Sequence, residues 1–113
     1  MENFMVQEND LYRLIYVTSD TEEESINLSK LILKNNLAAC ANIIKGSKSF
    51  YWWNDEINES LEYIIIFKTN SKNEKQLIKK LIKNHSYENP CVISIPIIKG
   101  NDAFLRWIDQ ETK

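Results

Sequence analysis

Three side chains of this sequence could bind a soft metal ion: the single histidine His85 and the two cysteines Cys40 and Cys91. Imidazole and thiolate groups are favoured ligands of copper and zinc in proteins. A stable site needs three or four ligands that converge on one point. The three side chains could make a thiolate-rich Cu(I) or Zn(II) site only if they converged across a subunit boundary.

Two of these residues also have a simpler structural explanation. Cys40 lies in a run of small residues, 38–41, where a buried cysteine packs as a small hydrophobic side chain. His85 follows the last turn of a predicted helix, where the helix dipole or hydrogen bonds would stabilise it. The sequence leaves the metal-binding and the structural interpretation of both residues open.

The sequence carries no recognisable catalytic pattern. It has no Ser-His-Asp arrangement, paired-carboxylate motif or CxxC pair. Its two glycines cannot build a glycine-rich phosphate loop. We therefore expect a binding or scaffold protein and not an enzyme, with an active site shared between subunits as the alternative.

The composition is that of one small globular domain. The chain has 113 residues, of which 43% are hydrophobic and 27% charged, enough for one modest core. Its net charge of −2 gives no basic excess for nucleic-acid binding, and the lysines at 79, 80 and 83 fit the solvated face of a helix. The longest strongly apolar run, 63–67, is too short to span a bilayer. We expect neither a nucleic-acid nor a membrane partner.

The cysteine content and the N-terminal residues bear on the location of the protein. Two cysteines are too few for a small secreted domain held by disulfides. Residues 1–10 are polar and without a periodic pattern, and they lack the basic and apolar segments of a signal peptide. We therefore expect a mobile tail over 1–10, a single domain over 11–113, and a cytoplasmic protein.

Hydrophobic periodicity predicts four strands and three helices in the order β-α-β-β-α-β-α. The expected strands are 11–18, 38–44 with a continuation to 53, 57–69 and 91–98, and the expected helices are 22–35, 72–85 and 102–110. Thr21 with Glu24, and Ser71 with Glu74, match the capping box that opens a helix. Asn54-Asp55 predicts the turn of a hairpin.

This order fits an α+β fold of the ferredoxin-like type, β-α-β-β-α-β, in which two helices cover one face of a four-stranded antiparallel sheet. Pro96 supports the arrangement, because a proline inside a strand favours a sheet edge and the fourth strand is an edge. An extra C-terminal helix follows, and we expect it to bury Phe104, Trp107 and Ile108.

The predicted strands are too apolar for a sheet with one face in water. The runs 14–17 and 64–67 are apolar at successive positions, so both faces carry apolar groups, whereas two helices cover only one. The other face would expose a larger apolar patch than monomers normally tolerate. We therefore expect an obligate oligomer. The alternative is that the last helix and the tail cover this face.

Consecutive aromatic residues at 50–53 precede the hairpin turn and would lie on both faces of the strand. Such residues are favoured in the cores of protein interfaces. A local aromatic cluster within one monomer is the alternative. The residues expected at the subunit interface are Phe50, Trp52, Ile65 and Ile95.

Several short pieces of the sequence match one known family in order and spacing. They are Leu37-Ala38-Ala39-Cys40-Ala41-Asn42; Gly46, Ser49, Tyr51 and Trp53; Glu62 and Phe67-Lys68-Thr69; His85, Tyr87 and Pro90; Ile95-Pro96-Ile97; and Gly100-Asn101, Phe104-Leu105 and Trp107-Ile108. Each piece is weak alone. Together they make the chain resemble the CutA family of divalent-cation tolerance proteins over about residues 11 to 110.

The resemblance implies a homotrimer with a shape like that of PII signalling proteins, in which the sheets pack towards the threefold centre and the hairpins reach onto neighbours. It also implies a role in tolerance of copper and other divalent metals, through metal or small-ligand binding and without a required cofactor. The alternatives are a ligand-free trimeric scaffold that docks other proteins, or a PII-like signalling module.

The copper ligands assigned in the family are only partly present in this chain. The family pattern has a cysteine at the end of the first strand and two adjacent histidines, and the corresponding positions here hold Val17, Asn84 and His85. Only the last of these is a ligand, so we expect that copper site to be degraded. Cys91 stands where the family commonly has Glu, which replaces a carboxylate by a softer ligand.

The resemblance finally implies a pocket between subunits. The residues that would line it are Tyr51, Trp53, Lys68 and Tyr87. A small anion could lie in this pocket beside Lys68.

Overall fold

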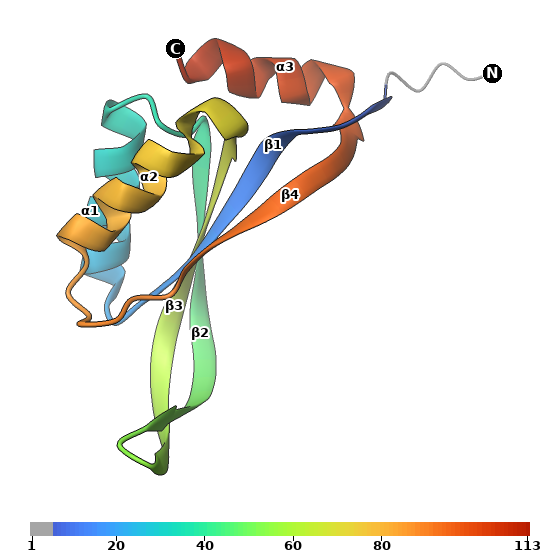
Figure 1. The fold of residues 1–113 in the computed structure, drawn as a ribbon. Helices are drawn as coiled ribbons and strands as arrows, with labels where there is room; N and C mark the ends of the chain where they lie inside the picture. The colour runs from blue at the N-terminus through green and yellow to red at the C-terminus, as the bar shows by residue number, and fades with distance from the viewer. Residues whose placement is uncertain (1–5) are drawn as a thin grey trace.

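A computed structural model describes the backbone of residues 6–113 and the side chains from Leu11 onwards. The elements are β1 (Val6–Ser19), α1 (Glu22–Lys34), β2 (Cys40–Trp53), β3 (Glu56–Asn70), α2 (Ser71–Asn84), β4 (Val92–Asn101) and α3 (Asp102–Glu111). The strands form one antiparallel sheet in the order β2-β3-β1-β4. Helices α1 and α2 lie side by side on one face of the sheet, and α3 crosses one end of it (Figure 1). This confirms the ferredoxin-like fold with an added helix, and it places Pro96 on an edge strand.

The first strand is longer than its apolar pattern indicates. It begins at Val6, whose backbone pairs with Asn101 of β4, and a register shift between Glu8 and Tyr12 interrupts the ladder. Residues 6–10 are therefore part of the sheet and not of a tail. Before Tyr12 the strand pairs with β4 alone, and such backbone pairing needs no apolar alternation in the sequence. The rest of the expected tail, 1–5, lies outside the described residues.

The two helices that cover the sheet begin with different caps from one another. Thr21 caps α1 as expected, since its side chain accepts a hydrogen bond from the Glu24 backbone N–H at 3.0 Å. In α2 the expected capping box is wrong. Ser71 is already helical, and Asn70 is the cap that accepts from the backbone N–H of Asn73 at 3.2 Å. Two adjacent polar residues can both begin a helix, and the sequence pattern selected the wrong one.

The main core lies between the sheet and the helices α1 and α2. Its members are Ile15, Val17, Leu28, Ile32, Leu37, Ala38, Ile65, Phe67, Leu77 and Leu81. Ile65 is 0% exposed and pairs with Val17 on the helix-covered face, so its expected place in a subunit interface is wrong. The run 64–67 is apolar at every position, and the sequence therefore does not show which of its residues face the helices.

One buried hydroxyl of this core has no hydrogen-bond partner. Ser29 of α1 is 7% exposed, and its Oγ is unsatisfied among the described residues. An unpaired buried polar group destabilises the folded state, and alanine favours a helix more than serine does. We therefore expect Ser29→Ala to raise the free energy of unfolding by about 1 kcal/mol, measured by urea denaturation.

Ser25, one turn earlier on α1, provides the matched control. Its Oγ lies 2.6 Å from the hydroxyl of Ser19 and donates to the Thr21 carbonyl at 2.9 Å. Ser25→Ala breaks these bonds and should lower the free energy of unfolding by about 1 kcal/mol. If Ser29→Ala destabilises the protein as Ser25→Ala does, Ser29 has a partner that the fold does not reveal.

Helix α3 packs with a different face from the one expected. Leu105 and Ile108 are buried against Tyr12, whereas Phe104 and Trp107 are 38% and 36% exposed, which corrects the expectation for these two aromatic residues. The buried positions continue to Thr112. Residues 105, 108 and 112 therefore face the sheet, and Phe104 and Trp107 lie to one side of them.

A hydrogen-bond network fixes α3 to the sheet. The Tyr12 hydroxyl donates to Asp109 Oδ2 at 2.6 Å, and Asn70 Nδ2 donates to Asp109 Oδ1 at 2.8 Å and to Thr112 Oγ1 at 3.1 Å. Both carboxylate oxygens of Asp109 are thus satisfied by residues of other elements. The C-terminal helix is held by polar bonds as well as by apolar burial.

Tyr12 makes the stability of the protein fall as the pH rises through the alkaline range. Burial, followed by the hydrogen bond and charge of Asp109, raises the pKa of Tyr12 to about 12 from its ordinary value of 10.0. A folded-state pKa above the unfolded one stabilises the fold below about pH 10, and this contribution is lost between about pH 10 and 12. We expect Tyr12→Phe to lower stability at pH 8 by about 1 kcal/mol and to weaken the further loss towards pH 11, measured by urea denaturation.

Tyr51→Phe is the control for this experiment, because Tyr51 is exposed on the hairpin. It should leave the stability at both pH values unchanged. A wild-type alkaline loss that persists in full in Tyr12→Phe would contradict the assignment to Tyr12.

The β2–β3 hairpin reaches well beyond the rest of the sheet (Figure 1). Its turn is at Asn54-Asp55 as expected, and both residues have positive φ, 53° and 62°, which is the conformation of a type I′ turn. Phe50 and Trp52 are 63% and 71% exposed, so the aromatic residues do not form a buried cluster within one chain. That alternative is therefore wrong.

Candidate functional site

His85 follows α2 directly, and its ring is fully buried, with a side-chain exposure of 0%. Its Nδ1 accepts a hydrogen bond from the Tyr87 backbone N–H at 3.1 Å. Its Nε2 lies 2.7 Å from the Thr18 carbonyl and therefore carries the proton that it donates there. Both ring nitrogens are occupied by backbone groups, so a metal ion would have to displace one of these bonds.

The loop after His85 is tied to two acidic residues. Glu24 Oε2 accepts from the Ser86 backbone N–H at 2.8 Å, and its Oε1 accepts from the Ser86 hydroxyl at 2.9 Å. The Tyr87 hydroxyl donates to Glu62 Oε2 at 2.7 Å. Burial, with the hydrogen bond to Glu62 as the second cause, raises the pKa of Tyr87. The carboxylate expected to complete the α1 capping box thus serves this loop.

The two cysteines lie at opposite edges of the sheet. Cys40 begins β2 and pairs with Lys68, whereas Cys91 precedes Val92, the first residue of β4. Two strands separate these edges, so the cysteines are about 14 Å or more apart in one chain. This distance is too long for a disulfide or a shared metal ion. Both cysteines are free thiols.

The surroundings of Cys91 favour the protonated thiol. Burial, and after it the charge of Glu62, raises the pKa of Cys91. Metal ions bind the thiolate, so binding here would have to displace a proton at some cost. Across the part of the chain whose side chains are described, no three His, Cys, Asp or Glu side chains are grouped closely enough to hold a metal.

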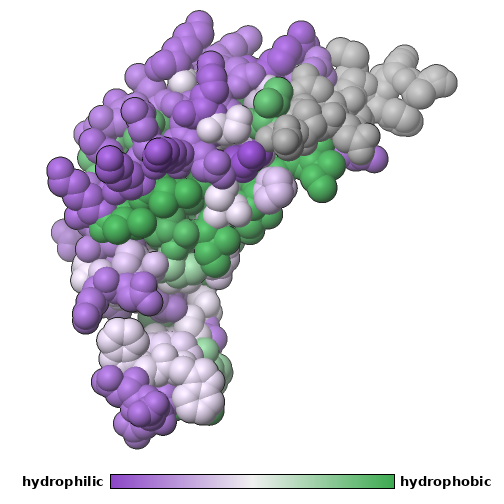
Figure 2. Space-filling view, viewed as in Figure 1, coloured by the Kyte–Doolittle hydropathy of each residue, from purple (hydrophilic) through white to green (hydrophobic). Residues whose placement is uncertain are grey.

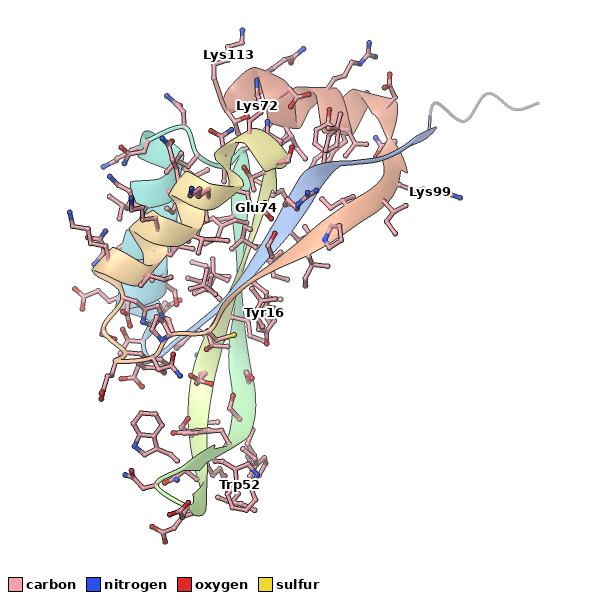
Figure 3. The ribbon with its side chains drawn as sticks, in the orientation of Figure 1. Tyr16, Trp52, Lys72, Glu74, Lys99 and Lys113 are labelled. Atoms are coloured by element: carbon pink, nitrogen blue, oxygen red, sulfur yellow. The ribbon has the colours of Figure 1, made fainter. Side chains whose placement is uncertain are left out.

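The sheet face opposite α1 and α2, called the open face below, is largely apolar. Strand pairing assigns to it Leu14, Tyr16 and Thr18 of β1, Cys40, Asn42 and Ile44 of β2, Ile64, Ile66 and Lys68 of β3, and Ile93 and Ile95 of β4. Ile44, Ile93 and Ile95 are 46%, 51% and 43% exposed. Hydrophobic residues gather over the sheet between the helical layer and the hairpin (Figure 2). Figure 3 shows Tyr16 on the side of the sheet away from α1 and α2.

Helix α3 covers only one end of the open face. It packs on Tyr12, Ala39 and Ile97, while Ile93 and Ile95 beyond it stay exposed. The alternative expected from the sequence is that the last helix and the tail cover this face. Helix α3 does so only at the end formed by Tyr12, Ala39 and Ile97. The rest of the open face has no cover within the described chain.

The four residues of the expected pocket do not meet within one chain. Tyr51 and Trp53 lie on the hairpin, and Tyr87 contacts Glu62. Lys68 lies six residues further along β3, a separation of about 20 Å for an extended strand. A pocket that contains all four would need more than one copy of the chain.

Lys68 has neighbours that the sequence analysis did not assign to it. Its Nζ donates to Asn42 Oδ1 at 2.7 Å and lies 5.8 Å from the centre of the Phe104 ring. Phe104 is in turn 5.4 Å from Trp107, centre to centre. Successive residues of a strand face opposite sides, and Phe67 and Thr69 are buried on the helix side. This alternation is the one signal in the sequence that could have placed Lys68 on the open face.

No helix among the described residues has the length and apolar character needed to cross a membrane.

Comparison with known proteins identifies the family. The sequence model of the CutA1 divalent ion tolerance protein matches residues 13–111. The chain belongs to the CutA1 family. It is 38% identical over 100 residues to the divalent-cation tolerance protein CutA of Archaeoglobus fulgidus, which covers 88% of this chain and 97% of the relative.

Solved structures of CutA1 family members have the same fold. The CutA1 protein of Ehrlichia chaffeensis matches with a TM-score of 0.88 and 35% identity, over 92% of this chain and 97% of that one. The protein described as the periplasmic divalent cation tolerance protein CutA of Archaeoglobus fulgidus matches with a TM-score of 0.88 and 37% identity, over 91% and 100%. The resemblance drawn from the short sequence pieces is thus confirmed.

Proposed function

We propose that this protein acts in tolerance of divalent metal cations as a homotrimer. Membership of the CutA1 family supports the cellular role. The uncovered open face is the observation that carries the assembly, because an apolar surface that includes Ile44, Ile93 and Ile95 is stabilised when other copies cover it. The number of three copies, and the PII-like arrangement of their sheets, rest on the resemblance to the family.

Because both ring nitrogens of His85 are hydrogen-bonded, the two cysteines are the better candidates for metal ligands in the trimer. Cys40 and Cys91 lie on the two free edges of the sheet, and a cyclic trimer brings different surfaces of neighbouring copies together. His85 already bonds to Thr18 and Tyr87, so it contributes only if one of these bonds opens. Copper in its monovalent form, Cu(I), or a thiophilic divalent ion such as Zn(II) is the class of metal that these thiols fit.

Calorimetric titration tests the metal role. The wild type should bind Cu(I) under reductant more tightly than Zn(II) or Cu(II), and Cys40→Ser combined with Cys91→Ser should abolish the tight binding. The control is Ser60→Ala, on β3 outside the thiol sites. Equal binding by the wild type and the double variant would exclude these cysteines as ligands.

A ligand-free trimeric scaffold is the second candidate. It is favoured by the hydrogen bonds at both ring nitrogens of His85, and by the burial that raises the pKa of Cys91 and so disfavours a metal-binding thiolate. A flat titration with all three ions, together with an intact trimer in sedimentation, would support the scaffold over the metal-binding protein.

We also propose a cytoplasmic location. Its support is that two separate free thiols persist best in a reducing compartment. Cell fractionation of the native host tests this, and recovery with a periplasmic marker, the location given in the description of the Archaeoglobus fulgidus relative, would contradict it.

A further inference from the structure

Lys68 is a charged residue in the middle of apolar rows on the open face. Its register neighbours across the sheet are Cys40 on one side and Leu14 on the other, followed by Ile95. The ammonium has one hydrogen bond, to the neutral amide oxygen of Asn42, and no ion pair among the described residues. A lysine in such a place loses solvation when the face is covered, so its charge needs an anion.

An aromatic pair of α3 lies next to this charge. The Phe104 ring is 5.8 Å from Lys68 Nζ, within the range of a cation–π contact, and the Trp107 ring is 5.4 Å from Phe104 with an angle of 39° between the planes. Both rings are more than one-third exposed, although the stripe of α3 beside them is buried. Flat apolar surface and positive charge are thus presented together at the end of the open face.

We propose that Lys68, Asn42, Phe104 and Trp107 form a site for a small organic anion with a flat apolar body. The carboxylate of such a ligand bonds to the Lys68 ammonium and to the Asn42 amide, and its ring packs on Phe104 and Trp107. An inorganic phosphate fits less well, because it makes no use of the two rings and no glycine-rich loop supplies backbone N–H donors. The ligand class is therefore an aromatic carboxylate.

This inference rests on the proposed trimer in one respect: covering the open face removes water from around Lys68 and strengthens its attraction for an anion. The competing arrangement is a carboxylate of a second copy that pairs with Lys68 in the assembly. A titration with a charged probe and its neutral analogue distinguishes the ligand site from this pairing between copies. A carboxylate of a second copy would occupy the position beside Lys68 and leave no room for the probe.

The test uses 1-naphthoate and its uncharged analogue 1-naphthamide as probes of the full-length protein. Calorimetry and the indole N–H signal of Trp107 in the NMR spectrum, assigned with Trp107→Phe, both report binding. The naphthoate should bind and shift this signal, and the naphthamide should bind at least about tenfold more weakly. Lys68→Gln should weaken naphthoate binding about tenfold or more, and Lys68→Arg should retain it.

Lys45→Gln is the matched control, since Lys45 is an exposed lysine of β2 away from α3, and it should leave the affinity unchanged. Sedimentation velocity on every variant reports the assembly separately from the site. Equal binding of the two probes, unchanged naphthoate affinity in Lys68→Gln, or no binding to the wild type would overturn the proposal. A monomeric wild type that still binds naphthoate through Lys68 would overturn the trimer and leave the site standing.

Discussion

Ile95→Glu is expected to convert the oligomer into a folded monomer. Ile95 is 43% exposed in the single chain, on the edge strand β4 and in the same row of the open face as Leu14. The substitution places a carboxylate in water when the chain is alone, so the fold of the monomer is unaffected. In the proposed trimer the same carboxylate is buried among apolar groups of a neighbour.

The expected size of this effect follows from the cost of burying a charge. An unpaired carboxylate in an apolar interface costs at least about 3 kcal/mol, and the cost recurs in each copy. At about 1.4 kcal/mol for each factor of ten, the dissociation constant of the assembly should rise more than about 100-fold. Sedimentation velocity at low micromolar concentration measures the change, and far-ultraviolet circular dichroism checks that the variant is folded.

Ile82→Glu is the matched control for Ile95→Glu. Ile82 is 52% exposed on α2, in the helical layer on the other side of the sheet. The same substitution there should leave the sedimentation coefficient unchanged. A wild type that sediments as a stable monomer, or an Ile95→Glu variant that assembles like the wild type, would remove the basis for the proposed trimer.

The sequence predicts the elements of this fold well because each has a local signal. Asn54-Asp55 marks the hairpin turn, and Thr21 begins α1, since turn and cap residues act within a few positions of one another. The edge position of Pro96 likewise follows from the missing N–H of proline. These signals do not depend on how distant parts of the chain meet.

The sequence does not determine which side chains of an apolar strand face the helices. Ile65 was expected at an interface, but it is fully buried under the helices, and its neighbours Ile64 and Ile66 face the open side. A strand that is apolar at every position fits either register equally well, because a shift of one residue exchanges its two faces. The choice is made by packing against α1 and α2, which is not a local property.

The candidate site was predictable in its residue types and not in its contacts. Cys40 and Cys91 carry the expected thiols, but the strand order places them on opposite edges of the sheet. The contacts of Lys68 with Asn42 and Phe104 join residues from three elements, and no spacing in the sequence records them. Such pairings follow from the sheet register and from the packing of α3.

His85→Ala should destabilise the protein strongly while leaving its metal affinity unchanged. The ring of His85 is fully buried, and its removal takes away its hydrogen bonds to the Thr18 carbonyl and the Tyr87 N–H. Each lost hydrogen bond of a buried group costs about 1–3 kcal/mol, and the cavity left by the ring adds to this, so the free energy of unfolding should fall by about 3–5 kcal/mol. Urea denaturation measures the loss.

The adjacent Asn84 separates the structural role of His85 from a general effect at the end of α2. Its side chain is exposed and donates only to the Lys80 carbonyl, so Asn84→Ala should change stability by less than about 1 kcal/mol.

Metal titration of His85→Ala below its unfolding temperature then tests whether the cysteines or His85 bind the metal. Tight Cu(I) binding that survives this substitution places the ligands at the cysteines, because an imidazole bonded at both nitrogens to the backbone has no lone pair to offer a metal. Loss of that binding with retained stability would make His85 a ligand and would require its bond to Tyr87 or Thr18 to open in the assembled protein.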